Sequence, residues 1–452
     1  MTNLKFKTNQ VITTLFFVSI FLLPFDSFPL FPTSSVYRPI AFFPLIVAFF
    51  LMLSTIRLSR FSLLVIFGSL LVLMYSIILG IIFFDNLSHI KKATITLALF
   101  AIMLSVYHKV IKYNLQNNKQ AFLDRLGKWA FYSFVFISFI GFIQFFMKLG
   151  IIPQIISEQI TLLFSYRTVN RMQMVSGEPA MMVRNILLLG TLIYFFYYGK
   201  YRKIVLTLVV FFLLVSGSTY GYMTIFLLIV TYMILFKPKL LFNIKVLLGI
   251  LLMVFSLSIS MSVFFDSYTR NKINIVLKTF SNLDADTVMT VVQSDGSAFQ
   301  RIMNPVIGFM SGDSTDYLGS GIDGYRYLYP HYINEYFPFA IDYLTVNAAV
   351  EGNSYITPKS LYSKIYAELG IVPFILFMSY LIYLYISIIK LRNKIYLPFL
   401  FSLSIVYILN TDSIIYLNYF FTLIFIHLTL NNLYKIKPKR SDLKNVKKTI
   451  VS

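Results

Sequence analysis

The polar stretch DGSAFQRIMNPVIGFMSGDSTDYLGSGIDGYRYLYPHYINEYF (295–337) decides how this chain folds, because it interrupts a sequence that is otherwise strongly apolar. It belongs to a longer segment, 264–360, that is rich in polar residues, glycine and tyrosine. Such a segment cannot lie irregularly in hydrocarbon, because each unpaired backbone N–H or C=O group there costs several kcal/mol. Loops of this length usually carry function. We therefore predict that 264–360 is an aqueous domain held between two membrane spans, and that it carries the chemistry.

The composition places the rest of the chain in a membrane. Of the 452 residues, 58% are hydrophobic and only 13% are charged, whereas about 25% are charged in a typical soluble domain. The chain has no cysteine, which excludes disulfides and thiolate metal ligands, and its four histidines are scattered. We therefore expect a polytopic membrane protein that uses neither a metal nor another cofactor.

Apolar runs recur along the chain at about 20 residues, the length that a hydrocarbon core of about 30 Å demands of a helix. They predict an all-α fold with about twelve membrane spans. The runs lie near 11–30, 36–56, 61–84, 90–108, 128–149, 178–198, 204–217, 219–236, 246–264, 361–389, 395–410 and 413–431. This division gives an N-terminal bundle of nine spans (1–263), the loop domain (264–360), three C-terminal spans (361–434) and a basic tail (435–452).

Lysine and arginine indicate how the chain is oriented, because short cytoplasmic loops carry an excess of them. With both termini inside, the inner segments hold 25 of the 39 basic residues and only two acidic ones, Asp124 and Asp442. The inverted topology would place every basic cluster on the wrong side. The net charge of +21 is therefore a signal of topology and does not indicate nucleic-acid binding. Both termini are expected in the cytoplasm, and the segments 151–177 and 264–360 face out.

Arginine is the residue best suited to an outward site that binds phosphate, because its planar fork stays charged and pairs with two oxygens. Arg171 and Arg301 each precede a glycine-containing, loop-like segment, RMQMVSG and RIMNPVIGFMSG. Arg184 differs because it lies inside a predicted span, where a charge is a functional hypothesis by default. The alternative for each is a surface arginine that solvates a loop or extends to the interface. The outer-side arginines are Arg38, Arg167, Arg171, Arg184, Arg270, Arg301 and Arg326.

Three residues are candidates for a general base. His331 is the only histidine in the large loop, although a lone histidine among tyrosines is more often a packed one. Glu178 precedes Pro179 at the start of a span, where capping competes with acid–base chemistry. Lys359 lies at the mouth of the next span.

A further pair in that span has a simpler explanation. Lys364 and Glu368 are separated by one helical turn, at i and i+4, which favours an ordinary ion pair between them.

Three segments together resemble the O-antigen polymerase/ligase family of bacterial envelope glycan assembly. They are Arg301 with the following NPVIGFM, YLGSGIDGY (317–325) and PKSLYSKIYAELGIVPF (358–374). The sequence is most similar to the Wzy-type polymerase branch. The resemblance covers the topology throughout and motifs over 167–180, 215–221 and 295–374. It implies a GT-C-like architecture and metal-independent glycosyl transfer on undecaprenyl-diphosphate-linked sugars.

The resemblance also implies roles for residues. Arg171 and Arg301 match the family's loop arginines, which hold the diphosphate, and Arg167 and Arg326 are expected to assist them. The ligases carry a His-Asn pair nine residues before the AE-x-G element, where this chain has Lys359. That departure leaves the base open among His331, Lys359 and Glu178.

The expected function is polymerisation of undecaprenyl-diphosphate-linked repeat units, for O-antigen or capsule, at the periplasmic face of the inner membrane. Expected partners are these lipid-linked glycans, membrane lipid, a chain-length regulator and a flippase, with no nucleic acid. One alternative is a ligase that moves the glycan to lipid A-core or another acceptor, and another is a polysaccharide flippase or transporter. A transferase requires Arg171 and Arg301 to converge on one outward pocket, whereas a transporter requires a central pore.

Overall fold

The protein is helical throughout the part that the structure describes, and this part contains no β-strand. The computed structural model describes residues 2–29, 37, 39–55, 58–84, 88–166, 168, 172–216, 218–243, 289, 292–293, 296–391, 395–411 and 413–436. The predicted span 246–264, Arg167, Arg171 and most of the basic tail lie outside the described residues. The all-α prediction is confirmed.

Nine helices come from the N-terminal half of the described chain. Their bounds are α1 Thr2–Phe21, α2 Phe42–Thr55, α3 Arg60–Phe84, α4 Ile90–Asn117, α5 Lys119–Lys148, α6 Gln154–Leu162, α7 Pro179–Phe196, α8 Arg202–Val215 and α9 Thr219–Phe236, followed by the short 3₁₀ turn η1 Pro238–Phe242. The remaining described helices are α13 Gly296–Ser314, α14 Tyr325–Tyr336, α15 Leu344–Val350, α16 Leu361–Leu369, α17 Ile371–Ile389, α18 Tyr396–Asn410 and α19 Leu417–Ile436, with the 3₁₀ turn η2 Pro338–Asp342.

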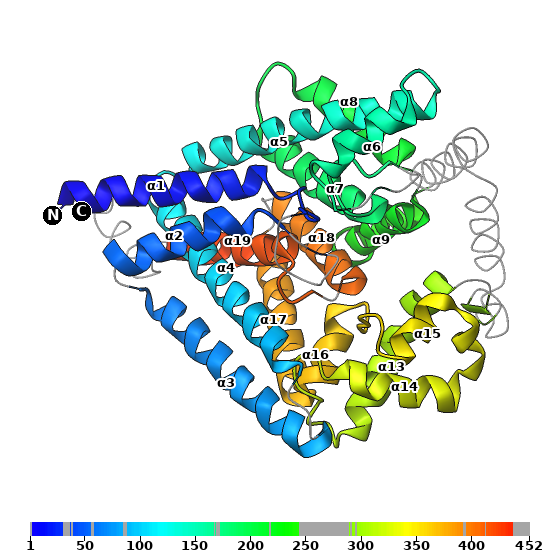
Figure 1. The fold of residues 1–452 in the computed structure, drawn as a ribbon. Helices are drawn as coiled ribbons and strands as arrows, with labels where there is room; N and C mark the ends of the chain where they lie inside the picture. Colours follow the sequence, from blue (N-terminus) through cyan, green and yellow to red (C-terminus); the bar gives the residue numbers. More distant parts are fainter. Residues whose placement is uncertain are drawn as a thin grey trace.

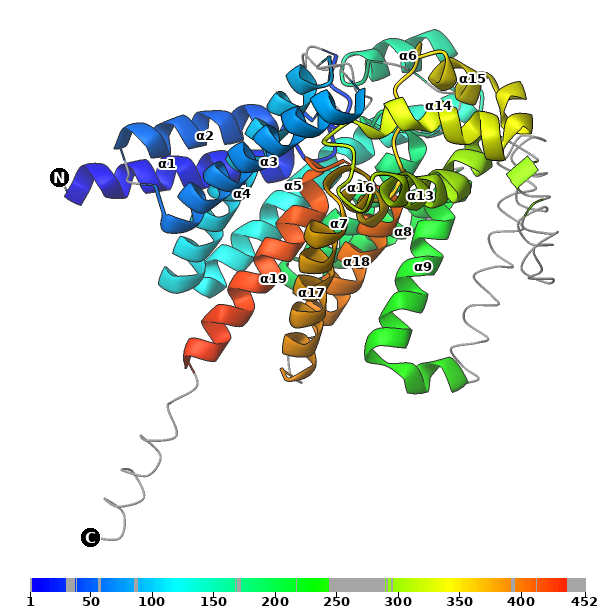
Figure 2. The same cartoon turned by 90° about the horizontal axis from the view of Figure 1, so that it is seen from below.

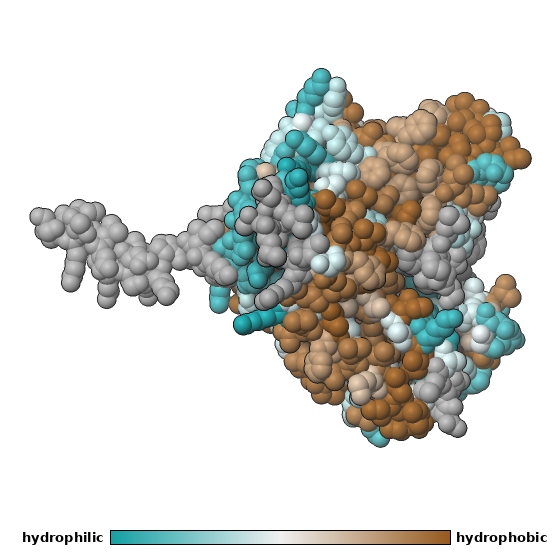
Figure 3. Space-filling view, turned by 60° about the vertical axis from the view of Figure 1, so that its left-hand side comes forward, coloured by the Kyte–Doolittle hydropathy of each residue, from teal (hydrophilic) through white to brown (hydrophobic). Residues whose placement is uncertain are grey.

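Apolar helices make this a membrane-embedded protein. Within the described ranges, α3, α4, α5, α7 and α17 are long and apolar enough to cross a bilayer, and α2, α9 and α18 contain shorter apolar stretches. Leu64 and Ile82 of α3 are 68% and 65% exposed, as expected for side chains that face lipid. Figure 3 shows the result as a broad hydrophobic surface bordered by hydrophilic regions.

The bundle has two distinguishable ends. Figure 2 shows α6, α14 and α15 gathered at one end, from which α9, α17 and α19 run away. We call this the loop end. Asn432 of α19 donates a hydrogen bond to the carbonyl of Leu115, at the end of α4, so these two helices meet at the opposite end.

The described part of the large loop has a hydrophobic core of its own. Phe299, Tyr325, Tyr329, Ile333 and Val346 are buried together there, contributed by α13, α14 and α15. α13 packs against α16, and α14 and α15 pack against α13, as Figure 1 shows in green and yellow. In its described part, the long polar segment thus forms short helices around aromatic side chains.

Two predicted boundaries differ from the structure. The apolar run 361–389 is two helices, α16 and α17, separated at Gly370, whose φ of 85° lies in the left-handed region that favours glycine. The N–H of Ile371 bonds instead to the carbonyl of Tyr317 in the large loop. The basic segment after 108 is also helical, because α4 continues to Asn117 and the side chain of Asn118 caps α5.

Candidate functional site

Two arginines meet at the loop end of the bundle around one tyrosine and one asparagine. Arg184 lies in the second turn of α7, is 5% exposed, and donates from Nη1 to the carbonyl of Asn410 at 3.2 Å. The Tyr220 hydroxyl, from the start of α9, donates to the carbonyl and to Oδ1 of Asn410 at 3.0 and 2.9 Å. Arg301 of α13 stacks on the same tyrosine, with Cζ 3.9 Å from the centroid of the Tyr220 ring. We call Arg184, Tyr220, Arg301 and Asn410 the arginine junction.

The junction contains buried hydrogen-bond donors that lack acceptors. Nε of Arg184 and Nδ2 of Asn410 have no hydrogen-bond partner among the residues that the structure describes. Buried polar groups in native proteins are almost always satisfied, so each exception needs an explanation. Because both orphaned groups are donors and the guanidinium groups of Arg184 and Arg301 adjoin Asn410 and Tyr220, the chemistry that completes the junction is an anion with several oxygen atoms.

A polar framework fixes the start of α7, and with it Arg184. Asp26, which is 1% exposed, accepts from the N–H of Gly177 at 2.9 Å and from Nδ2 of Asn185 at 2.7 Å. Asn418 of α19 in turn donates to Oδ1 of Asn185 at 2.7 Å. The sequence analysis did not select Asp26, although an acid within the apolar run 11–30 was a usable signal.

Glu178 adjoins the junction. It occupies the N-cap of α7, is half-buried, and its side chain makes no capping hydrogen bond. Its charge and that of Asp26 act on Arg184. Pro179 at the first helical position sets the direction of the chain here.

The other predicted site residues lie elsewhere or outside the described chain. His331 is 68% exposed on α14 and forms an ion pair with Glu335 at 3.0 Å. Lys359 is half-buried in the loop before α16, with φ 62°. Arg326 donates to the hydroxyls of Ser88 and Tyr327 at 3.1 and 2.6 Å. Arg167 and Arg171 fall outside the described ranges. Of the seven candidates, Glu178 and Arg301 therefore lie at the junction.

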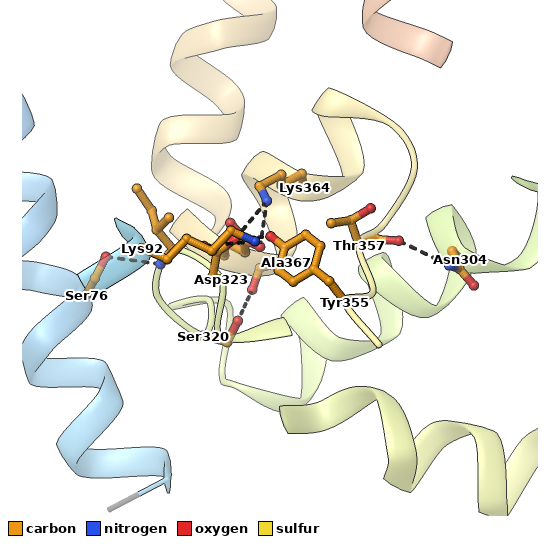
Figure 4. A network of polar contacts seen from close by, with 11 residues as sticks. Ser76, Lys92, Asn304, Ser320, Asp323, Tyr355, Thr357, Lys364 and Ala367 are labelled. Atoms are coloured by element: carbon orange, nitrogen blue, oxygen red, sulfur yellow. Dashed lines mark hydrogen bonds and ion pairs between the residues drawn. The ribbon is translucent and has the colours of Figure 1, made fainter. Parts of the chain in front are cut away.

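A second polar site is the buried charge cluster, which we define as Lys92, Asp323, Lys364 and Glu368 with Tyr355. Figure 4 shows Lys92, Asp323, Lys364 and Tyr355 close together. Nζ of Lys364 lies 3.4 Å from Oδ1 of Asp323 and 3.2 Å from Oε1 of Glu368. Nζ of Lys92 lies 3.9 Å from Oδ2 of Asp323 and 2.8 Å from the centroid of the Tyr355 ring. The Tyr355 hydroxyl donates to Asp323. The cluster ties the large loop to α4 and α16.

The lysines and the acidic residues of this cluster act on one another's charge. Burial by itself would raise the pKa of Asp323, but Lys364 and Lys92 outweigh it and hold that pKa below its usual value. Burial raises the pKa of Glu368 to about 7 despite the attraction of Lys364. Glu368 belongs to α16, whose nine residues are too short to cross a bilayer. Asp323 is thus the permanent anion between two lysines, and we assign the cluster a structural role.

Sequence reasoning missed most of this cluster. Lys364 and Glu368 were expected to pair only with each other, and neither Lys92 nor Asp323 was selected. One signal was present, because Lys92 is a basic residue at a span end that the orientation rule makes the outer one.

The loop YLGSGIDGY (317–325) brings Asp323 into place through a very close backbone approach. The N–H groups of Ser320 and Gly321 donate to the carbonyls of Ala367 and Glu368 at 2.9 and 2.8 Å. Gly319 has φ 83°, and a Cβ built there would lie 2.6 Å from the backbone nitrogen of Gly370. This contact leaves no room for a side chain.

Replacing Gly319 by alanine is therefore expected to destabilise the protein more than replacing Gly352. Both glycines have positive φ, at 83° and 75°, but a Cβ on Gly352 would meet nothing within 4 Å. Gly319→Ala adds overpacking, which costs about 1–3 kcal/mol, to the backbone strain that the two variants share. Thermal unfolding of the purified full chain in detergent measures the difference as a lower Tm. Equal Tm values for the two variants would contradict the close approach.

The geometry can be set beside known proteins. No family model, curated protein or solved structure matched the chain. Among the residues that the structure describes, no group of three or more histidine, aspartate or glutamate side chains is placed to hold a metal ion. The function is therefore argued from the junction and the membrane setting.

Proposed function

We propose that this protein is a membrane glycosyltransferase that joins undecaprenyl-diphosphate-linked oligosaccharide units at the periplasmic face of the bacterial inner membrane. The proposal includes about twelve spans and a GT-C-like arrangement. The observation that carries it is the pair of guanidinium groups, Arg184 bonded to Asn410 and Arg301 stacked on Tyr220, together with donors on Arg184 and Asn410 that have no partner within the described part of the chain. A diphosphate supplies the acceptor oxygens that this arrangement lacks.

The proposed step is a displacement at the anomeric carbon of the donor glycan. An acceptor hydroxyl oxygen forms a new bond to this carbon, the bond from the carbon to the diphosphate oxygen breaks, and the lipid diphosphate leaves with the electron pair. Negative charge grows on the leaving group during this step. Fixed cations aimed at that charge are commonly the largest single catalytic contribution, at about 10²–10³-fold for one donor group.

The acceptor hydroxyl must lose its proton to a base. Of the three candidates, Glu178 is the one whose charge acts on Arg184. It is half-buried and not engaged in capping. His331 is exposed and paired with Glu335. We therefore assign the base role to Glu178.

The membrane setting fits a lipid-linked substrate. The junction is built at the ends of α7, α9 and α18, which contain apolar stretches suited to hydrocarbon. A polyprenyl tail can remain in the bilayer while its diphosphate reaches the arginines. A site for a soluble sugar nucleotide would need no such position.

The test is the glycan made by cells from which the gene has been deleted, compared with complemented cells. We expect single-unit glycan on the surface acceptor of deletion cells and a full ladder after complementation, both read on gels of envelope glycan. A ligase would instead leave a lipid-linked polymer that never reaches its acceptor. A normal ladder in deletion cells would refute the proposal.

A transporter is the second candidate, and one observation favours it. The break between α16 and α17 at Gly370 lies beside buried charges on Asp323, Lys364 and Glu368, and discontinuous helices with nearby charges are typical of transporters. Loss of a transporter would remove both single units and polymer from the outer face. The deletion experiment therefore separates the two functions.

A further inference from the structure

A second site at the loop end is a small polar cavity that the proposed chemistry leaves unused. Its volume is about 150 Å³, and it lies between the end of α5, the helix α6 and the segment that begins at Met172. Met147 and Met172 provide apolar surface. Its polar lining includes Gln144, Gln154, Ser157, Glu158, Thr161 and Gln173.

One side chain builds the wall of this cavity. Gln144, which is 4% exposed, donates from Nε2 to Oγ1 of Thr161 and to the carbonyl of Met174, each at 2.9 Å. Its Oε1 accepts from the N–H groups of Gln173 and Met174 at 3.1 and 2.8 Å. Met174 has φ 51°, a left-handed conformation that persists only where the surroundings impose it. The hydrogen bonds of Gln144 and the conformation of Met174 thus define the shape of this wall.

The cavity also presents a hydroxyl group. Ser157 is 3% exposed and lines the cavity, and its backbone carbonyl accepts a hydrogen bond from the hydroxyl of Thr161. Beside it, Gln154 donates to Glu158 at 2.6 Å. Lys148 also lines the cavity. The lining therefore offers hydroxyl and amide groups together with charged groups of both signs.

The position of α6 places the cavity at the surface of the membrane. Ile155 and Leu163 are 66% and 67% exposed on the face of this segment away from the cavity. Phe139 of the neighbouring span α5 is likewise 66% exposed. A helix with one apolar outer face and one polar inner face, next to a lipid-facing span, is suited to lie in the interface between bilayer and water.

The cavity is connected to the arginine junction by a short segment of chain. Met172 and Gln173 line the cavity, and the same segment continues to Gly177, which Asp26 holds, and to Glu178. The oxygen of a lipid diphosphate and the sugar attached to it lie next to each other in the same molecule. A sugar site within one segment of a diphosphate site is the arrangement that such a molecule requires.

We propose that this cavity binds one pyranose unit of a lipid-linked glycan, with Ser157 and the amide groups of Gln154 and Gln173 bonding its hydroxyls and the two methionines packing on its C–H face. The inference rests on the proposed function for its substrate class. The volume suits a single ring, and amide and hydroxyl groups give selectivity because an unmatched polar group in such a site is costly.

The test compares two substitutions of equal chemistry on opposite faces of the same helix. Ser157→Phe fills the cavity, whereas Ile155→Phe adds an aromatic ring on the lipid side. The full chain in nanodiscs is probed by saturation-transfer NMR with glucose, galactose, N-acetylglucosamine and N-acetylgalactosamine. We expect binding of at least one sugar by the wild type and by Ile155→Phe, and at least tenfold weaker binding by Ser157→Phe. Binding of none of the four sugars, or equal binding by both variants, would overturn the proposal.

The same variants in cells separate this inference from the polymerase proposal. We expect Ser157→Phe to shorten the glycan ladder and Ile155→Phe to leave it unchanged, at equal protein levels. An unchanged ladder with Ser157→Phe, in cells whose ladder still depends on the gene, removes the cavity from the reaction and leaves the polymerase proposal intact. A normal ladder in deletion cells together with Ser157-dependent sugar binding refutes the polymerase and retains the sugar site.

Discussion

Replacing Arg301 by alanine is expected to leave the protein at normal levels in the membrane while reducing polymerisation by about 10²–10³-fold, so that envelope glycan stops at single units. Arg301 is exposed and stacks on Tyr220, so its loss removes charge from the junction without opening the core. Arg301→Lys should restore little chain length, because an ammonium group lacks the planar fork that binds two oxygens and stacks on the ring. The readout is the glycan ladder, with protein quantified by immunoblot.

Arg326→Ala provides the comparison. Arg326 is also an arginine of the large loop, but it bonds to Ser88 and Tyr327, away from the junction. We expect its ladder to stay close to that of the wild type. A full ladder with Arg301→Ala would exclude Arg301 from the site, and equal loss in both variants would indicate that any basic residue of the loop suffices.

Replacing Asp323 by alanine is expected to destabilise the protein by about 3–5 kcal/mol, because it leaves the buried Lys364 and the half-buried Lys92 without their shared anion. Asp323 is 4% exposed and contacts both Lys364 and Lys92. Glu368→Gln should cost far less, since burial already raises the pKa of Glu368 to about 7 and a neutral side chain suits that site. Unfolding of the purified chain in mixed micelles, followed by circular dichroism, measures both.

A double variant tests the cause of that loss. Adding Lys364→Met to Asp323→Ala removes one of the stranded charges and should recover part of the lost stability, as expected for residues that interact directly. If Asp323→Ala alone stays within about 1 kcal/mol of the wild type, a typical value for substitutions away from such features, the cluster does not hold the loop in place.

The helices were predictable where interactions between neighbouring residues alone determine them. The run 61–84 became α3 Arg60–Phe84, 219–236 became α9 Thr219–Phe236, and 395–410 became α18 Tyr396–Asn410. In hydrocarbon a chain must pair its own backbone N–H and C=O groups, so an apolar run of sufficient length forms a helix. The break at Gly370 was not predictable in this way, because the carbonyl that receives the N–H of Ile371 belongs to Tyr317 in a distant part of the chain.

The candidate site likewise contains residues that the sequence revealed and residues that it did not. Arg184 and Glu178 could be selected because charge beside or within an apolar run is visible in the sequence, and Arg301 because it precedes a glycine-containing segment of the polar stretch. Tyr220 could be read only as part of a turn, and Asn410 carried no signal. Their part in the junction depends on which helix ends meet.

By itself, the sequence determined that this protein is a set of apolar helices with one long polar insertion, because hydropathy and backbone satisfaction act over neighbouring residues. Only the tertiary structure decided that Arg184 and Arg301 share Tyr220 and Asn410, that Asp323 lies between Lys92 and Lys364, and that Gln144 closes a cavity against α6. The physical reason is that charge and hydrogen-bonding interactions operate over a few ångströms in space, irrespective of separation along the chain.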